Sequence, residues 1–240
     1  MVSTGVDEMQ RYAGQALVVA VDGPAGSGKS TAARRVAAEL GLRYLDTGAM
    51  YRALTWWLLA EQVELADTAA IVARMTEPRI VVGTDPGDPQ ISVDGLDVAG
   101  PIRSREVSNS VSAVAAVPQV RELLIRMQRQ IISDAAAEGP GIVAEGRDIG
   151  TVVAPDAAVK VYLTASEDTR ARRRAADLTA DPGATVDTTL REQARRDQRD
   201  AAQLAMAADA VRIDTTGLGL DEVVGEIVAM ARARQAMAHG

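Results

Sequence analysis

A run of small residues near the start of the chain has the types and the order of a phosphate-binding loop. It reads Gly23-Pro24-Ala25-Gly26-Ser27-Gly28-Lys29-Ser30, with Thr31 next, and fits the pattern G-x-x-x-x-G-K-[ST]. Glycines allow successive backbone N–H groups to turn toward phosphate oxygens, and a following helix would offer its positive end. Lys29 would then reach the β- and γ-phosphates of a nucleoside triphosphate, and the Ser30 hydroxyl would bind Mg²⁺.

The elements beside this loop are those that the motif requires. The apolar segment Leu17–Val21 before it predicts a buried strand, and Ser30–Leu40, closed by Gly41, predicts a helix. Further strands are predicted at Arg43–Leu45, Ile142–Ala144, Ala158–Leu163 and Ala210–Ile213. Since helical patterns separate these strands, we expect an α/β fold with a parallel five-stranded sheet and helices on both faces.

A different pattern interrupts this series. Short alternating segments at Arg79–Val82, Gln90–Val93 and Leu96–Val98 are separated by tight-turn residues, of which Asp94-Gly95 is the strongest hairpin signal. Strands joined by tight turns cannot belong to a parallel crossover series. We therefore expect a small antiparallel insert beside the core, with helical arms at Ala49–Glu61 and Val107–Asp134.

Two charged helices are expected further along the chain. Ser166 is a suitable N-cap for the first, which carries Arg170, Arg172, Arg173 and Arg174, and the second runs from about Thr188 to Asp200. Such charge runs form either solvated helix faces or, beside a phosphate loop, a lid that closes over the nucleotide. The expected division is a flexible extension over residues 1–15 and one domain over 16–240, with the insert at about 49–134 and the lid at about 170–205.

Composition excludes several classes of protein. The chain has 240 residues, a net charge of −7, 47% hydrophobic residues and no cysteine, so it is expected to bury a core without disulfides or Cys-based zinc sites. The only histidine is His239, which excludes mechanisms that need a histidine base. The negative net charge argues against a surface for polymeric nucleic acid, and no apolar run is long enough to span a bilayer, so neither partner is expected. The absence of cysteine fits a cytoplasmic enzyme, which we expect to be a monomer.

Two further clusters narrow the choice among proteins with such a loop. They are Asp46-Thr47-Gly48-Ala49-Met50-Tyr51-Arg52 and, after an apolar strand, Glu145-Gly146-Arg147-Asp148-Ile149-Gly150. Ligands bind outside the carboxyl ends of parallel strands, where the second cluster is expected. The base-reading segment [NT]-K-x-D of GTPases is absent, because the only lysines are Lys29 and Lys160.

Together with Asp22-Gly23-Pro24, these clusters resemble the bacterial cytidylate kinases, which are nucleoside monophosphate kinases of the adenylate-kinase-like fold. The resemblance extends from about Leu17 to Ala229 and includes Ile102-Arg103, Pro118-Gln119-Val120-Arg121 and Arg196-Asp197. It implies transfer of the γ-phosphate of ATP to CMP or dCMP, with Mg²⁺ as cofactor. A nucleoside monophosphate is largely a dianion at pH 7 and can attack without a general base, which suits a chain with no usable histidine.

The resemblance also assigns roles to individual residues. Arg52 and Arg147 would bind the acceptor phosphate, because forked guanidinium groups suit phosphates, with Thr47 nearby. By the same resemblance, the edge of the cytosine would contact Ser112, Arg121 and Asp148, and the sugar would contact Arg196 and Asp200. Arg103 is also assigned to the acceptor site. Arg170, Arg173 and Arg174 would close over ATP, and Glu145 is a weaker candidate for holding Mg²⁺ or its waters.

One segment departs from the family pattern. Family members usually carry another phosphate-contacting Arg a few residues after the Asp that matches Asp200, and then a Pro-Leu step. Here Ala201-Ala202-Gln203-Leu204-Ala205-Met206 follows, with no Arg before Arg212. We hypothesise that Arg199 or a lid arginine substitutes, or that activity is reduced but real.

Three alternatives remain open at this point. UMP could serve as acceptor, or the acceptor could be a small alcohol, with Asp46 or Asp148 taking the hydroxyl proton. In a third interpretation, the chain binds a nucleotide without catalysis and its arginines dock a protein partner. A panel of acceptors distinguishes all three.

Overall fold

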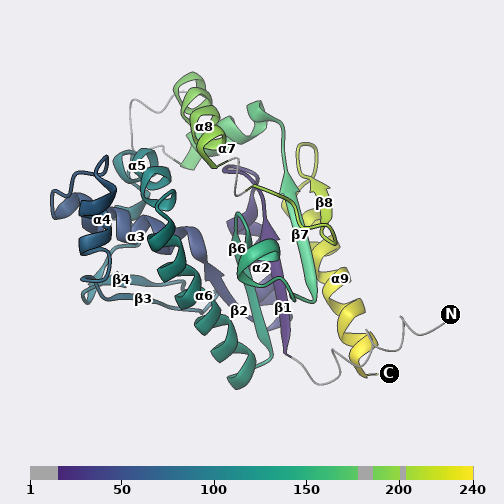
Figure 1. Ribbon diagram of the computed structural model, residues 1–240. Helices are drawn as coiled ribbons and strands as arrows, with labels where there is room; N and C mark the ends of the chain where they lie inside the picture. Colours follow the sequence, from purple (N-terminus) through teal and green to yellow (C-terminus); the bar gives the residue numbers. More distant parts are fainter. Residues whose placement is uncertain (1–15, 178–185, 201–203, 240) are drawn as a thin grey trace.

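The computed structural model describes residues 16–177, 186–200 and 204–239, except for the side chains of 174–177, 186, 187, 189, 192, 193, 196, 238 and 239. Its centre is a parallel sheet whose strands lie in the order β2-β6-β1-β7-β8 (Figure 1). These strands are β1 (Leu17–Asp22), β2 (Arg43–Asp46), β6 (Gly141–Gly146), β7 (Val159–Thr164) and β8 (Val211–Asp214). The predicted α/β class and five-stranded parallel sheet are confirmed. The predicted extension over residues 1–15 lies outside the described residues.

Helices cover both faces of this sheet because alternate residues of its strands point to opposite sides. Along β1, Val19 and Val21 pack with α2 (Lys29–Leu40) and α9 (Leu220–His239) in one buried cluster. The neighbouring Val18 and Ala20 belong to a second cluster with α3 (Thr47–Ala60) and α6 (Pro118–Glu138). Burial on both faces explains why the strands are continuously apolar instead of alternating.

The predicted antiparallel insert is a separate three-stranded sheet in the order β3-β4-β5. Its strands are β3 (Ile80–Val82), β4 (Ile91–Val93) and β5 (Leu96–Asp97). Asp94 and Gly95 join β4 to β5 with φ angles of 52° and 83°, the left-handed geometry that favours these residue types in hairpins. Nearby lie α4 (Thr68–Arg74), a 3-10 helix (Pro101–Arg103) and α5 (Arg105–Ala115).

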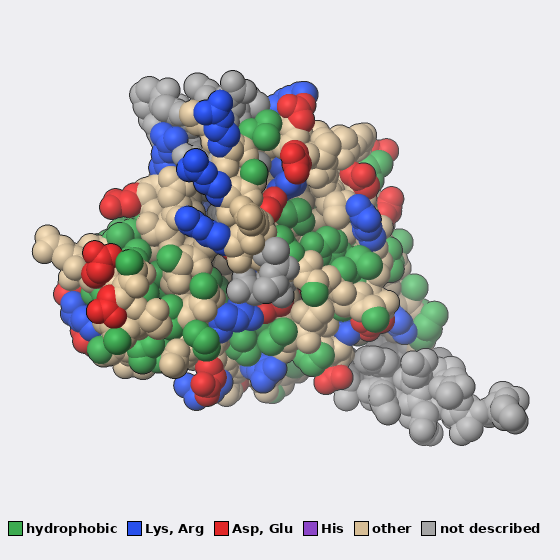
Figure 2. Space-filling model, turned by 45° about the horizontal axis from the view of Figure 1, so that its top comes forward, with side chains coloured by type: hydrophobic (Ala, Val, Ile, Leu, Met, Phe, Trp, Pro, Cys, Tyr) green, Lys and Arg blue, Asp and Glu red, His purple; other side chains and the backbone are tan. Residues whose placement is uncertain are grey.

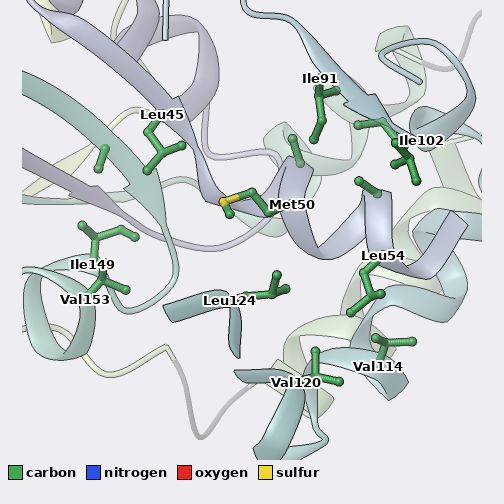
Figure 3. Packing of buried hydrophobic residues seen from close by; sticks show 14 of the residues in the cluster. Leu45, Met50, Leu54, Ile91, Ile102, Val114, Val120, Leu124, Ile149 and Val153 are labelled. Atoms are coloured by element: carbon green, nitrogen blue, oxygen red, sulfur yellow. The ribbon is translucent and has the colours of Figure 1, made fainter. Parts of the chain in front are cut away.

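Helix α3 joins the insert to the core through one buried stripe. Met50 and Leu54, spaced one turn apart, are fully buried and pack with side chains of α6, α5 and β4, among them Leu124, Val114 and Ile91 (Figure 3). The loop after β3 is also tied to the core, because Tyr44 donates a backbone hydrogen bond of 2.8 Å to the Thr84 carbonyl. The Arg34 Nε of α2 donates to the Pro86 carbonyl at 3.1 Å.

The expected single arm over Val107–Asp134 is wrong, because the structure has two helices there, α5 and α6. Val117 between them is extended, with ψ 118°, and Pro118 starts α6. Proline disfavours helical geometry in the residue before it and lacks the N–H that a continuous helix would need. The helical break turns α6 back toward the sheet, where it packs on β6.

Two helices follow β7 and lie side by side over the carboxyl ends of the strands (Figure 1). They are α7 (Glu167–Asp177) and α8 (Val186–Asp200). The Ser166 hydroxyl accepts the Thr169 N–H at 3.3 Å, as expected of the N-cap of α7. Among the described helices, none is long and apolar enough to cross a membrane.

Candidate active site

The predicted phosphate loop connects β1 to α2, as the motif requires. Gly23 has a φ of 145°, and a Cβ there would lie 2.1 Å from the Leu163 carbonyl oxygen, so only glycine fits where the loop leaves the sheet. Lys29 Nζ donates to the Pro24 carbonyl at 2.9 Å. The loop therefore presents its backbone and Lys29 at the carboxyl end of β1.

A cavity of about 260 Å³ opens beside this loop. It is lined by Ala25, Gly26, Gly28, Lys29, Ser30, Thr31, Asp46, Thr47, Gly48, Tyr51, Arg52, Arg103, Val111, Ser112, Ala115, Arg121, Glu145, Gly146, Arg147, Asp148 and Asp200. Figure 2 shows a row of Lys and Arg side chains that runs from the top of the molecule toward the centre of this face. Most of the residues predicted to bind the donor and the acceptor therefore line one cavity.

Arg52 of α3 is held close to the end of β2 by its contact with Asp46, the last residue of that strand. Asp46 caps α3 by accepting the Ala49 N–H at 2.8 Å, and its second oxygen accepts from Arg52 Nη2 at 2.9 Å. The Arg52 Nε is buried without a hydrogen-bond partner among the described residues. Arg52 is therefore ion-paired with the N-cap residue of its own helix, and its guanidinium keeps one buried donor without a partner among the described residues.

Arg121 of α6 and Asp148 form an ion pair at another part of the wall. Burial alone would lower the pKa of Arg121, but its hydrogen bond with Asp148 raises the pKa above the usual value, so the guanidinium stays charged. Tyr51 lies beside this pair, and burial raises the pKa of its phenol to about 12. The pair presents a carboxylate and a guanidinium side by side, which is a donor and acceptor set for a heterocycle edge.

Asp200 connects three parts of the fold. Its Oδ1 accepts from the Ser112 hydroxyl of α5 at 2.9 Å, and its Oδ2 lies 3.2 Å from Arg147 Nη2. Arg147 Nη1 donates to the Gly23 carbonyl at 2.9 Å. The last residue of α8 is thereby linked to the insert and, through Arg147, to the phosphate loop.

Glu145 lies under the loop at the end of β6 and is almost fully buried. Tyr44 donates its hydroxyl to Glu145 Oε1 at 2.8 Å. Burial raises the pKa of the Glu145 carboxyl, while Lys29, Ser30 and Tyr44 act in the opposite direction. The carboxylate and the Ser30 hydroxyl supply the hard oxygen donors that Mg²⁺ prefers, and substrate phosphates commonly complete such a site. No group of three acidic or histidine ligands occurs among the described residues.

The predicted lid arginines contact the loop backbone in the structure. Arg170 is buried, and its Nη1 donates to the Ala25 carbonyl at 3.2 Å and to Asp197 at 2.5 Å. Arg173 donates to the Thr215 hydroxyl at 2.9 Å and lies against the Ser27 carbonyl. The side chains of Arg174 and Arg196 lie outside the described residues. The ATP-binding role of these arginines stays a prediction.

Several cavity residues were not assigned from the sequence. Gly48, Tyr51 and Gly146 belong to the two sequence clusters, which give them no role of their own, and Asp46 has a predicted role only in the alternative with an alcohol acceptor. Val111 and Ala115 lie one helical turn apart on α5, on either side of Ser112 in sequence. Residues four apart lie on the same face of a helix, so the spacing of Val111 and Ala115 could have placed them near Ser112 at the site. Conversely, Gly23, Pro24 and Ser27 belong to the loop without lining the cavity.

Comparisons with known proteins agree with this geometry. A family model described as cytidylate kinase matches residues 19–233. The chain is 48% identical to a cytidylate kinase of Streptomyces avermitilis over 92% of this chain and 95% of the relative. It is 50% identical to a cytidylate kinase of Streptomyces coelicolor, over the same shares of each, and 46% identical to one of Streptococcus pneumoniae, over 90% and 97%. The chain belongs to the cytidylate kinase family of nucleoside monophosphate kinases.

Proposed function

We propose that this protein transfers the γ-phosphate of ATP to CMP or dCMP, giving ADP and CDP or dCDP. The observation that carries the proposal is one cavity that joins the phosphate loop to Arg52 of α3, Arg121 of α6 and Arg147, which follows β6. Two polyanions must meet for the reaction to occur, so positive charge on both sides of one space is the main requirement. Membership of the cytidylate kinase family supports the same reaction.

The donor end of the cavity is formed by the loop amides and Lys29. Lys29 binds the β- and γ-phosphates and balances charge that develops on the transferred group. Ser30 and Glu145 would hold Mg²⁺ or its waters, and the ion would supply positive charge that offsets the negative charge of the substrate phosphates. Arg170 and Arg173, which contact the loop carbonyls of Ala25 and Ser27, would exclude water from the reacting group when α7 and α8 close over the donor.

The acceptor end is formed by residues that exchange partners when the substrate binds. Arg52 and Arg147 receive the phosphate of CMP, and Thr47 lines the same cavity. Asp148 accepts the exocyclic amine of cytosine, and Arg121 and Ser112 donate to its ring acceptors. Asp200 and Arg196 contact the sugar, and Arg103 adds positive charge to the acceptor site. The dianionic phosphate attacks in line without a general base.

Transfer to a small alcohol fits this cavity less well. That reaction needs a free carboxylate to take the hydroxyl proton, but Asp46 is bonded to Arg52 and Asp148 to Arg121. A carboxylate held by a guanidinium is a weaker base, because the positive charge favours its ionised form. UMP differs from CMP at the exocyclic group that Asp148 faces in this proposal and at N3, which is an acceptor in cytosine and an N–H donor in uracil. UMP is therefore the competitor that tests this assignment.

The test is ADP formation from MgATP by purified protein with CMP, dCMP, UMP, AMP, shikimate or no acceptor. We expect the highest turnover with CMP and dCMP. Turnover that depends on an alcohol alone, or ATP hydrolysis that no acceptor stimulates, would overturn the acceptor assignment while leaving the loop in place. The monomeric state, the cytoplasmic location and the absence of polymeric nucleic acid as a partner stay predictions from the sequence.

A further inference from the structure

The π-helical turn Ile149–Val153 directly follows Asp148 and positions it. Asp148 occupies the N-cap position of this turn, with φ −143° and ψ 31°, where an aspartate normally accepts N–H groups of the first turn. Its side chain makes no such bond and pairs with Arg121 instead. Another group must therefore satisfy the first N–H groups of the turn.

That group is the carboxylate of Asp22, which lies far away in the sequence. Asp22 Oδ1 accepts the Ile149 N–H and Oδ2 accepts the Gly150 N–H, each at 2.8 Å. Asp22 ends β1, where it is paired in register with Gly146 of β6, so the sheet itself fixes its distance from the turn. Only 5% of Asp22 is exposed, and burial raises the pKa of its carboxyl although the two N–H groups favour the charged form.

Space around the turn is consistent with this arrangement. A Cβ added to Gly150 would lie 3.4 Å from Asp22 Oδ2 and 3.2 Å from the Lys160 side chain. The turn is thus packed closely between β1 and β7. The Gly150 N–H, at the second position of the turn, is one that a capping side chain at Asp148 would use.

We propose that Asp22 is a positioning residue for acceptor recognition: by capping the turn in place of Asp148, it leaves the Asp148 carboxylate available to Arg121 and the base. The same strand end that begins the phosphate loop would then set the specificity of the acceptor site. This inference rests on the proposed function, because it takes Asp148 as the group that reads cytosine.

The test compares kcat/KM for CMP and UMP in wild-type protein and in Asp22→Asn. The Asn amide keeps one acceptor oxygen, but its NH2 group faces the other backbone N–H and cannot accept from it. One hydrogen bond is therefore lost, and one N–H group of the turn is left without an acceptor. Asp148 can supply it by turning back from Arg121. We expect the CMP to UMP ratio of kcat/KM to fall by about tenfold or more in Asp22→Asn.

A matched control and a double variant separate positioning from general damage. Asp67 Oδ1 accepts two backbone N–H groups, at 2.9 and 3.2 Å, and Asp67 does not line the cavity. Asp67→Asn therefore removes the charge of a capping carboxylate away from the site, and it is expected to keep the wild-type ratio. If Asp22 acts through Asp148, then adding Asp22→Asn to Asp148→Asn should change the ratio by no more than about twofold. An equal fall of kcat/KM for CMP and UMP in Asp22→Asn would overturn the proposal.

A second variant tests the cap without changing Asp22. In Asp148→Ala the turn should keep its wild-type protection of the Ile149 and Gly150 amides from hydrogen exchange, because Asp22 still accepts both. Loss of that protection would assign the cap to Asp148 and overturn the proposal, even if Asp22→Asn does not fold. Failure of the wild-type protein to use CMP would instead refute the proposed function, so the two failures are distinguishable.

Discussion

The donor and acceptor ends of the cavity are built in different ways. The donor end is a short continuous segment between β1 and α2, and most of its binding groups belong to the backbone. The acceptor end is assembled from side chains of α3, α5, α6, α8 and the strand ends, which hold one another through ion pairs. A local loop is fixed by glycine geometry, whereas an assembled site depends on the positions of several elements at once. Substitutions at the donor end should therefore lower turnover with every acceptor, whereas substitutions at the acceptor end should mainly affect the use of CMP.

The largest expected effect comes from the donor end. Lys29→Met removes the charge that faces the transferred phosphate, and we expect kcat to fall by about 10³-fold or more with every acceptor. The matched control is Lys160→Met, because Lys160 is the only other lysine and pairs with Asp209 outside the cavity lining. Steady-state kinetics with circular dichroism checks both variants. Retained turnover in a folded Lys29→Met protein would refute the loop assignment.

At the acceptor end the effect should be selective. Asp148→Ala is expected to raise KM for CMP by about ten- to a hundredfold, because a buried charge-assisted bond is lost, while KM for ATP changes little. Initial rates over a grid of both substrates measure the two constants separately. Equal increases in the two KM values would mean that Asp148 supports the whole cavity rather than the base.

A smaller effect is expected at the segment after Asp200, where the sequence predicts a departure from the family pattern. Gln203→Arg returns an arginine to the segment after Asp200, and one restored charge-assisted contact is expected to raise kcat/KM for CMP by up to about tenfold. Gln203→Leu serves as the control for changing this position without adding charge. An unchanged kcat/KM in Gln203→Arg would indicate that the missing arginine does not limit this protein.

The smallest effect should come from a link between the two ends. Arg34 of the donor helix α2 bonds to the loop after β3 in the insert, partly in solvent. Arg34→Ala is expected to lower the free energy of unfolding by about 1 kcal/mol or less, with kcat unchanged. Thermal unfolding and CMP turnover check this. A marked fall in kcat would show instead that this contact couples the insert to the donor site.

The same contrast explains what the sequence could predict. The loop and the buried strands depend on residues that are close in sequence, so glycine spacing and apolar runs were sufficient. Apolar spacing alone does not predict the break at Pro118, because buried apolar residues recur at helical intervals on both sides of it. Contacts such as Ser112 with Asp200, 88 residues apart, and Asp22 with Ile149, 127 residues apart, exist only once the sheet order is known. The family resemblance named many residues of the acceptor end but did not give their mutual pairing.

The most direct test of the account is binding of a bisubstrate compound in which five phosphates join adenosine to cytidine through their 5′ positions. If the loop and the arginines share one cavity, this compound should bind one per chain, compete with both ATP and CMP, and bind at least about 10²-fold more tightly than either in calorimetric titration. An affinity no better than that of ATP, or competition with ATP alone, would contradict the claim that the two ends form one site.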